Sequence, residues 1–236
     1  MKNLAVITAR GGSKRIPEKN IKEFCEKPIL TYSIEAALEC KRFDEVMVST
    51  DSRKIAHVAV QYGAKVPFFR SRETSDDYAT TAQVLLEVLS EYEKCGHIFD
   101  TICCIYPTAP FVTAEKLQHA FDCMEREDAD AVVSVVQYSF PPQRAFVIQD
   151  RLLQYQYPQY ATARSQDLEP IYHDCGQFYL CKVKSFRLYK SLIVPKTVPL
   201  IMPEIEVQDI DNISDWEIAE IKYQYMKERR QHDDNK

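Results

Sequence analysis

Apolar runs of strand length alternate with helix-like segments along most of this 236-residue chain. The strand signals lie at residues 4–8, 45–50, 66–69, 101–106 and 131–136. The helix signals between them lie at residues 28–40, 52–62, 80–94 and 113–124. Repeated β–α units of this kind predict a parallel sheet with right-handed connections and helices on both faces.

The pattern changes after residue 136. Residues 137–175 are rich in proline, tyrosine and glutamine, and apolar runs at 146–148 and 152–153 predict a short hairpin. We interpret this segment as an excursion from the sheet, suited to a lid or a dimer contact. Strand signals return at residues 177–181 and 198–202.

A final helix is predicted at residues 214–229, with Ser214 as its N-cap and Glu217 completing a capping box. We therefore expect one α/β domain over residues 1–236. Its architecture is expected to be a three-layer fold with a mainly parallel, twisted sheet and a small excursion at about 137–175.

Composition excludes several classes of protein. The net charge of −5 argues against a dedicated nucleic-acid binder, and no apolar run is long enough to cross a membrane. The first residues lack a signal-peptide pattern. The eight cysteines form no C-x-x-C spacing and favour buried thiols over a disulfide framework. These features predict a cytoplasmic protein without a nucleic-acid or membrane partner.

The loop after the first predicted strand, residues 9–20, is the most informative local feature. It holds two of the chain's five glycines, Gly11 and Gly12, beside four cations opposed in sequence only by Glu18. The cations are Arg10, Lys14, Arg15 and Lys19. Glycine lets a backbone approach a ligand closely, and N–H groups beside cations form an anion site. The loop thus predicts polyphosphate binding, although it matches neither the Walker nor the dinucleotide spacing.

Two carboxylates near the C-terminus, Asp209 and Asp211, form a second motif. In extended backbone they point the same way, and the paired charges favour recruitment of a cation. Mg²⁺ suits one or two carboxylates completed by phosphate oxygens. The alternative is a simple turn before the last helix. The anion loop favours the metal interpretation, because phosphate, cations and metal recur together in phosphoryl chemistry.

Two polar segments leave alternatives open. Residues 49–51, Ser-Thr-Asp, end the second predicted strand and either line a ligand crevice or cap the next helix. In residues 68–81, Thr80 and Thr81 either cap a helix or meet a ribose or base. For this second segment a solvated face is the favoured interpretation.

Further along the chain, residues 106–111 form a rigid, proline-containing loop at a strand end. Arg164 could pair with a substrate carboxylate in fork geometry or form a dimer salt bridge. His173 is more simply explained as structural. No nucleophile elbow and no H-E-x-x-H motif is found, which disfavours hydrolase and zinc-protease functions.

Four motifs, taken in chain order, resemble those of the CMP-sialic acid synthetase family of cytidylyltransferases, over essentially the whole chain. They are Arg10-Gly11-Gly12-Ser13 with Lys19-Asn20, Ser49-Thr50-Asp51, Pro107-Thr108-Ala109-Pro110 and Asp209-Ile210-Asp211. Sialate synthetases typically carry glutamine where this chain has Tyr106. That tyrosine, with Phe111 and residues 68–71 and 172–179, is more similar to the pseudaminic acid cytidylyltransferase branch.

The resemblance implies a Rossmann-like nucleotidyltransferase fold and roles for particular residues. It assigns the CTP triphosphate to Arg10, Gly11, Gly12, Ser13, Lys19 and Asn20. It places Arg70 and Thr80 or Thr81 near the cytidine. It assigns Mg²⁺ to Asp209 and Asp211. It directs Tyr106, Arg164, Gln166 and Tyr172 toward the sugar acid, with Arg164 as the candidate for its carboxylate.

The implied reaction is attack of the anomeric hydroxyl of a nine-carbon 2-keto sugar acid on the α-phosphorus of CTP. Arg10, Lys19 and Asp211 are the expected catalytic residues, because they face the leaving pyrophosphate and the metal. The resemblance also implies a homodimer, with the middle segment reaching the partner, and a place in surface-glycan biosynthesis such as flagellin glycosylation.

Other substrates and one other class of function stay open. Pseudaminic acid is the expected substrate; sialic acid, legionaminic acid and the eight-carbon ketodeoxyoctonate are alternatives. A non-catalytic nucleotide-binding module is the remoter alternative. Such a module would keep the anion loop but would have no need of Asp209 and Asp211.

Overall fold

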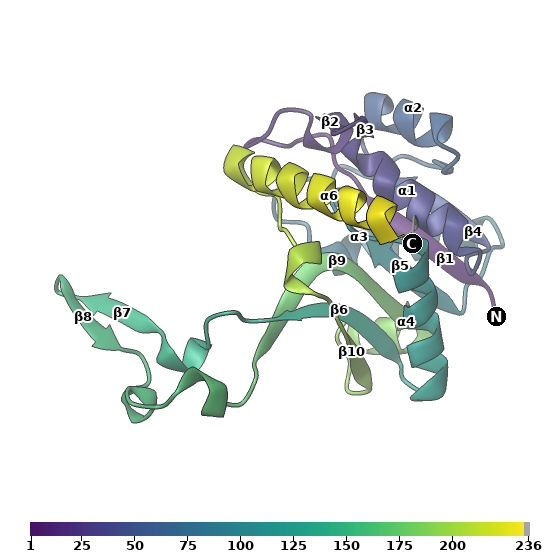
Figure 1. The fold of residues 1–236 in the computed structure, drawn as a ribbon. Helices are drawn as coiled ribbons and strands as arrows, with labels where there is room; N and C mark the ends of the chain where they lie inside the picture. Colours follow the sequence, from purple (N-terminus) through teal and green to yellow (C-terminus); the bar gives the residue numbers. More distant parts are fainter. Residues whose placement is uncertain (234–236) are drawn as a thin grey trace.

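A six-stranded twisted sheet forms the centre of the computed structural model, which describes residues 1–233 (Figure 1). Its strands, in spatial order, are β10 (Thr197–Ile201), β6 (Ala131–Gln137), β9 (Tyr172–Lys182), β5 (Thr101–Ile105), β1 (Asn3–Thr8) and β4 (Glu45–Ser49). Neighbouring strands pair in parallel, except that β9 is antiparallel to both β5 and β6. The prediction of a mainly parallel sheet is confirmed; the reversed strand β9 was not anticipated.

Helices cover both faces of this sheet and confirm the three-layer prediction. One face packs against α1 (Ile29–Cys40), α2 (Arg53–Gln61) and α4 (Ala114–Arg126). The other packs against α3 (Thr81–Lys94) and α5 (Val183–Tyr189). Side chains alternate along a strand, so β1 sends Ala5 and Ile7 to the first face and Leu4 and Val6 to the second.

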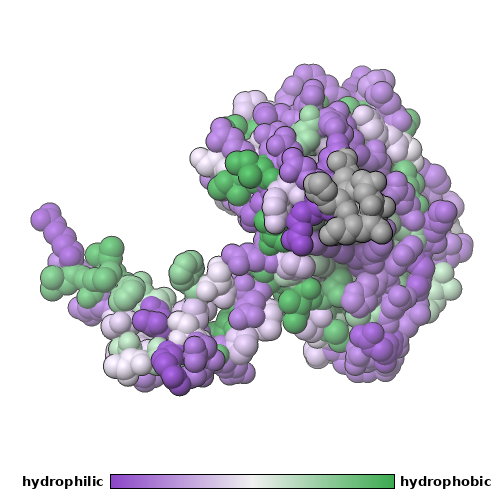
Figure 2. All heavy atoms as spheres, in the orientation of Figure 1, coloured by the Kyte–Doolittle hydropathy of each residue, from purple (hydrophilic) through white to green (hydrophobic). Residues whose placement is uncertain are grey.

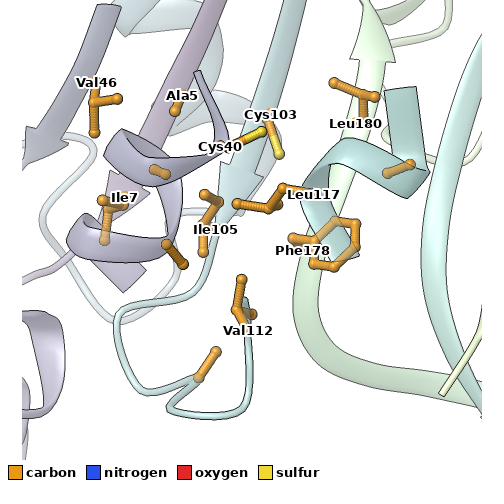
Figure 3. Packing of buried hydrophobic residues seen from close by; sticks show 14 of the residues in the cluster. Ala5, Ile7, Cys40, Val46, Cys103, Ile105, Val112, Leu117, Phe178 and Leu180 are labelled. Carbon is orange, nitrogen blue, oxygen red and sulfur yellow. The ribbon is translucent and has the colours of Figure 1, made fainter. Parts of the chain in front are cut away.

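The core on the first face consists of closely packed, buried side chains. Ile105, Leu117 and Phe178 come from β5, α4 and β9 and meet there, each at most 1% exposed (Figure 3). Burial of one such side chain contributes roughly 1.5–3 kcal/mol. This packing holds the carboxyl end of β5, an interior strand of the sheet, in place.

The prediction that the cysteines are free thiols is confirmed, and most of them are buried. All eight are unpaired; Cys95 is exposed and Cys25 is partly exposed. Burial raises the pKa of Cys104, and likewise that of Cys181, to about 12. These thiols therefore stay protonated at neutral pH and act as small apolar side chains.

A smaller core joins the two ends of the chain. It draws side chains from the loop before η1 (Lys19–Ile21), from β2 (Glu23–Phe24), from α1 and from the last helix, α6 (Ile213–Asp233). The strand β2 pairs with the short strand β3 (Lys27–Pro28). Phe24 meets Trp216 edge to face, with ring centroids 5.5 Å apart. Ile16 and Ile210 are both fully buried in this cluster. The cluster therefore brings the loop of residues 9–20 beside residues 209–211.

The helix caps follow the sequence except at the last helix. Ser52, Thr80 and Thr113 cap α2, α3 and α4, as their residue types allow. The prediction of Ser214 as a cap is wrong, because α6 begins one residue earlier. Asn212 Oδ1 accepts the N–H of Asp215 at 3.1 Å, and Asp215 Oδ2 accepts the N–H of Asn212 at 3.0 Å. Asn212 and Asp215 therefore form the capping box.

Two further predictions of secondary structure are corrected. The strand predicted at residues 66–69 does not form; an isolated bridge with Met47 lies one residue earlier, at Lys65. The strand predicted at residues 177–181 begins earlier, at Tyr172, and continues into the unpredicted α5. None of the described helices has the length and apolar character that a membrane crossing requires.

The excursion predicted at residues 137–175 is confirmed as an arm between β6 and β9. We call residues 138–171 the arm; it projects from the body and ends in a hairpin (Figure 1). The hairpin pairs β7 (Phe146–Gln149) with β8 (Leu152–Tyr155). Short 3₁₀ turns flank it at Pro142–Arg144, Pro158–Tyr160 and Ser165–Asp167, and another, Glu204–Glu206, precedes α6. Apolar side chains gather on the arm, among them the exposed Phe140, Phe146, Ile148, Leu152 and Leu153 (Figure 2).

Candidate functional site

A cleft of about 620 Å³ opens at the carboxyl ends of β1 and β5. The chain leaves β1 for β4 on one side and reaches β5 on the other, and ligands bind at such a reversal of strand order. Three predicted motifs line the cleft: the loop of residues 9–20, residues 107–108 after β5, and residues 209 and 211. Motifs far apart in the sequence thus share one site.

The cations of the loop are paired with carboxylates and a carbonyl from distant segments. Arg10 Nη1 donates to Asp77 Oδ1 at 2.6 Å, and Lys14 also pairs with Asp77. Arg15 Nη2 lies 2.8 Å from Asp211 Oδ1. Glu18, the acidic neighbour in sequence, instead pairs with Lys54. The charge balance of the loop is therefore set by the tertiary structure.

Lys19 lies between the loop and the acidic pair. Its Nζ donates to the carbonyl oxygen of Ile210 at 2.6 Å. Burial lowers the pKa of Lys19, while the nearby Asp211 and Asp209 act in the opposite direction. A partly desolvated ammonium interacts more strongly with a phosphate than an exposed one, because the local dielectric is lower.

The two glycines of the loop have different surroundings. The N–H of Gly11 donates to Asp51 Oδ1 at 2.7 Å, and a Cβ on Gly11 would lie 3.0 Å from Ser52 Cβ. A Cβ on Gly12 would meet nothing within 4 Å. Neither glycine has a positive φ. Gly11 is needed for close packing against the start of α2, whereas Gly12 leaves room beside the cleft.

Ser13 and Asn20, also predicted to bind the nucleotide, belong to the same loop. Both line the cleft. The side chain of Asn20 is buried, and its Nδ2 donates to the carbonyl oxygen of Arg10 at 2.9 Å. Asn20 therefore holds the backbone of Arg10 in place.

Asp209 and Asp211 both line the cleft, while Ile210 between them is fully buried. Their predicted common direction is confirmed, although the segment is a loop and not a strand. Asp215 Oδ2 accepts the N–H of Asp211 at 2.9 Å and so orients it. Within residues 1–233, no group of three or more His, Cys, Asp or Glu side chains could hold a metal. Two carboxylates fit Mg²⁺ when phosphate and water oxygens supply the other ligands.

The residues predicted to lie near the cytidine, Arg70, Thr80 and Thr81, are not among those that line the cleft. Arg70 donates from Nε to Ser49 Oγ at 3.1 Å and from Nη2 to Ser49 O at 2.8 Å. Burial lowers the pKa of Arg70. Thr80 caps α3, and the Thr81 side chain lies beside the phenol of Tyr106. In this structure all three side chains interact with protein groups.

Of the four predicted sugar-facing residues, Tyr106 lines the cleft and the other three do not. The Tyr106 ring packs beside Tyr179, with centroids 5.7 Å apart. Arg164 and Gln166 lie on the arm, where Arg164 Nε pairs with Asp167 Oδ2 at 2.7 Å. Tyr172 begins β9 at the base of the arm. Within one chain the arm points away from the body (Figure 1).

Asp77 is the residue of the site that escaped the sequence-based candidates. It lines the cleft, although its acidic neighbourhood favoured a solvated face. No signal marked Asp77 apart from its neighbour Asp76. Asp51, a candidate from its position at a strand end, holds the backbone of Gly11 and does not line the cleft.

Comparison with known proteins agrees with this arrangement. The sequence profile of a family described as cytidylyltransferase matches residues 4–213, and the chain belongs to this cytidylyltransferase family of nucleotidyltransferases. It is 39% identical over 229 residues to a pseudaminic acid cytidylyltransferase of Campylobacter jejuni, covering 97% of this chain and 99% of the relative. It is 36% identical to a CMP-N,N'-diacetyllegionaminic acid synthase of Legionella pneumophila, covering 93% and 95% of the two chains.

Solved structures show the same fold at low sequence identity. A CMP:2-keto-3-deoxy-manno-octonic acid synthetase, solved with CTP, superposes with a TM-score of 0.67 and 17% identity. The match covers 97% of this chain and all of the other. The mixed sheet with helices on both faces is therefore the cytidylyltransferase architecture.

Proposed function

We propose that this chain joins CMP from CTP to pseudaminic acid, a nine-carbon 2-keto sugar acid, and releases pyrophosphate. The observation that carries the proposal is 39% identity along almost the whole chain to an enzyme named for this reaction. The cleft supports it, because phosphate-binding cations and paired carboxylates face one space. No step requires a protein nucleophile, so binding and charge stabilisation account for catalysis.

In the proposed site, Arg10 and Lys19 bind the phosphates and stabilise the charge that builds on the departing pyrophosphate. Ser13 and Gly12 border the phosphates, and Asn20 keeps Arg10 in place. Asp209 and Asp211 would hold Mg²⁺. When bound, this ion would neutralise phosphate charge and increase the electrophilicity of the α-phosphorus. Arg70, Thr80 and Thr81 form the adjoining wall on the cytidine side.

The sugar acid would lie beside Tyr106, and the arm suggests how further contacts arise. Arg164, Gln166 and Tyr172 contact it in this proposal when the arm of one chain reaches the cleft of a second copy. The exposed apolar side chains of the hairpin support such a homodimer, because a free hairpin is only marginally stable in water. We further propose a cytoplasmic enzyme that supplies activated sugar for surface glycans such as those on flagellin.

The direct test offers CTP and Mg²⁺ with each of four acids: pseudaminic, N-acetylneuraminic, legionaminic and ketodeoxyoctonic. Pyrophosphate release should be fastest with pseudaminic acid. Legionaminic acid is the informative competitor, because a relative named for it is 36% identical. Preference for any other acid refutes the proposed substrate. Absence of Mg²⁺-dependent pyrophosphate release with all four would favour a non-catalytic nucleotide-binding module.

A further inference from the structure

Asp77 occupies an unusual position in the cleft. Its two carboxylate oxygens are shared between two cations, with Oδ1 on Arg10 Nη1 at 2.6 Å and Oδ2 on Lys14 Nζ. The carbonyl oxygen of Asp76 adds a contact to the same Arg10 nitrogen at 3.2 Å. Both cations line the cleft where the phosphates are proposed to bind. An internal anion therefore sits on the cations that a triphosphate needs.

These contacts are of a kind that a polyphosphate can replace. The Arg10 and Asp77 side chains are 40% and 41% exposed, and Lys14 is 79% exposed. Exposed ion pairs are weak, whereas a triphosphate or pyrophosphate presents several charged oxygens at once. If Asp77 stayed in place, its charge would repel a phosphate bound to the same cations.

The segment around Asp77 can move without disturbing the fold. Residues 75–79 form neither helix nor strand, and Tyr78 in this segment is 90% exposed. Hydrogen bonds fix the chain on either side of this segment. Before it, the Thr74 hydroxyl donates to the Glu87 carboxylate, and after it, Thr80 caps α3. The two cations provide the contacts of the Asp77 carboxylate across the cleft.

We propose that Asp77 is a built-in counter-ion, displaced from Arg10 and Lys14 when nucleotide phosphates bind and returning as pyrophosphate leaves. Asp77 thereby sets the affinity of the site for phosphates and assists product release. The Lys14 and Arg10 contacts lower the pKa of Asp77, so it is ionised throughout the neutral range. The inference rests on the proposed function, because it assumes that phosphates bind these cations.

The test measures binding of inorganic pyrophosphate, and separately of CTP, by calorimetry with Mg²⁺ present. Asp77→Asn keeps the shape and removes the charge, so we expect about two- to tenfold tighter pyrophosphate binding, the scale of two exposed ion pairs. Asp77→Glu retains the charge and should bind like wild type. Asp122→Asn is the matched control, since it removes an exposed pair with Arg42 away from the cleft. In the Lys14→Ala background the gain from Asp77→Asn should shrink.

A second measurement follows the movement in a chain that keeps Asp77. Tyr78→Trp places a reporter at an exposed position, while Trp216 is buried and serves as an internal reference. Pyrophosphate should change the emission of the new tryptophan. An unchanged emission, or pyrophosphate binding by Asp77→Asn that is equal to or weaker than wild type, overturns the inference. If the wild type binds neither CTP nor pyrophosphate, the proposed function is overturned as well. If it binds them but Asp77→Asn and Tyr78→Trp give the contrary results, only the inference about Asp77 is overturned.

Discussion

Adjacent glycines in the loop of residues 9–20 have different surroundings. Gly11 packs closely against Ser52 and donates its N–H to Asp51, so its role is internal to the protein. Gly12 faces open space, which leaves room for a ligand in the proposed site. At the residue scale, packing requires the first glycine, and the proposed phosphate binding would require the second.

This difference predicts opposite outcomes for two similar variants. Gly11→Ala overpacks the loop against α2 and should cost about 1–3 kcal/mol of unfolding free energy. Gly12→Ala should leave stability unchanged and raise the KM for CTP, because the new methyl group enters the phosphate space. Urea unfolding and steady-state kinetics measure the two effects. A destabilised Gly12→Ala with normal KM would contradict the assignment.

Charge at the reacting phosphates can be tested by removing single side chains. Arg10→Ala and Asp211→Ala should each lower the rate of pyrophosphate release by about 100- to 1,000-fold. Both side chains are partly exposed, so the melting temperature should change little. Arg126→Ala, which removes a surface pair with Glu127, is the control and should keep full activity. Near wild-type turnover in either site variant would refute its catalytic role.

Tyr106 is the residue at which substrate preference can be changed. Tyr106 lines the cleft, where its ring packs against Tyr179 and its phenol lies beside Thr81. Tyr106→Gln exchanges an aromatic ring for an amide that both donates and accepts hydrogen bonds. We expect kcat/KM for pseudaminic acid to fall relative to that for N-acetylneuraminic acid. An unchanged ratio would remove Tyr106 from the specificity determinants.

At the scale of elements, the start of α6 links stability to the site. Asp215 closes the capping box with Asn212, and the same oxygen accepts the N–H of Asp211. The N-terminus of this helix therefore orients a carboxylate proposed to bind metal. Serine and asparagine cap helices about equally well, so residue type alone could not decide between Asn212 and Ser214.

Asp215→Ala should therefore have two effects. Loss of the capping interactions should cost about 1 kcal/mol of unfolding free energy. The Mg²⁺ concentration that gives half-maximal activity should rise, since Asp211 is no longer oriented. Thermal unfolding and Mg²⁺ titration of the reaction measure these changes. Ser214→Ala is the neighbouring control and should change neither.

At the scale of the whole molecule, some of the residues predicted to contact the sugar lie on the arm, away from the cleft of the same chain. Arg164 lies on the arm, and Tyr106 lies in the body. The arm carries exposed apolar side chains with no cover inside one chain (Figure 2). A symmetric dimer, in which the arm of each chain packs against the body of the other, would explain both observations.

Complementation tests this arrangement. Arg10→Ala and Arg164→Ala should each be inactive alone. After mixing and exchange of subunits, about a quarter of the sites should combine an intact loop with an intact arm from the other chain. A mixture of Arg10→Ala and Lys19→Ala should recover nothing, because both changes lie in one chain's cleft. Recovery in neither mixture, with exchange verified by co-purification of an untagged variant with a tagged one, would show that Arg164 does not act across the dimer.

Hydrophobic periodicity and residue type, each read within about ten neighbouring positions, already determined much of the secondary structure of this protein. The alternating elements and the arm were readable because each depends on neighbours in sequence. The loop of residues 9–20 and the Asp209–Asp211 pair were also recognisable as separate motifs. The cap of α6 at Asn212 and the antiparallel direction of β9 could not be predicted. In each case the sequence allows alternative structures that differ little in free energy.

Tertiary structure alone decided how these motifs are combined. Burial of Ile16 and Ile210 in one apolar cluster brings the anion loop beside the acidic pair, and Arg15 then meets Asp211 across 196 positions. Arg10 likewise meets Asp77 across 67 positions. Contacts between charges depend on the path of the whole chain, which no local pattern encodes. Local physics therefore determined the parts of the site, and packing of the core determined its charge balance.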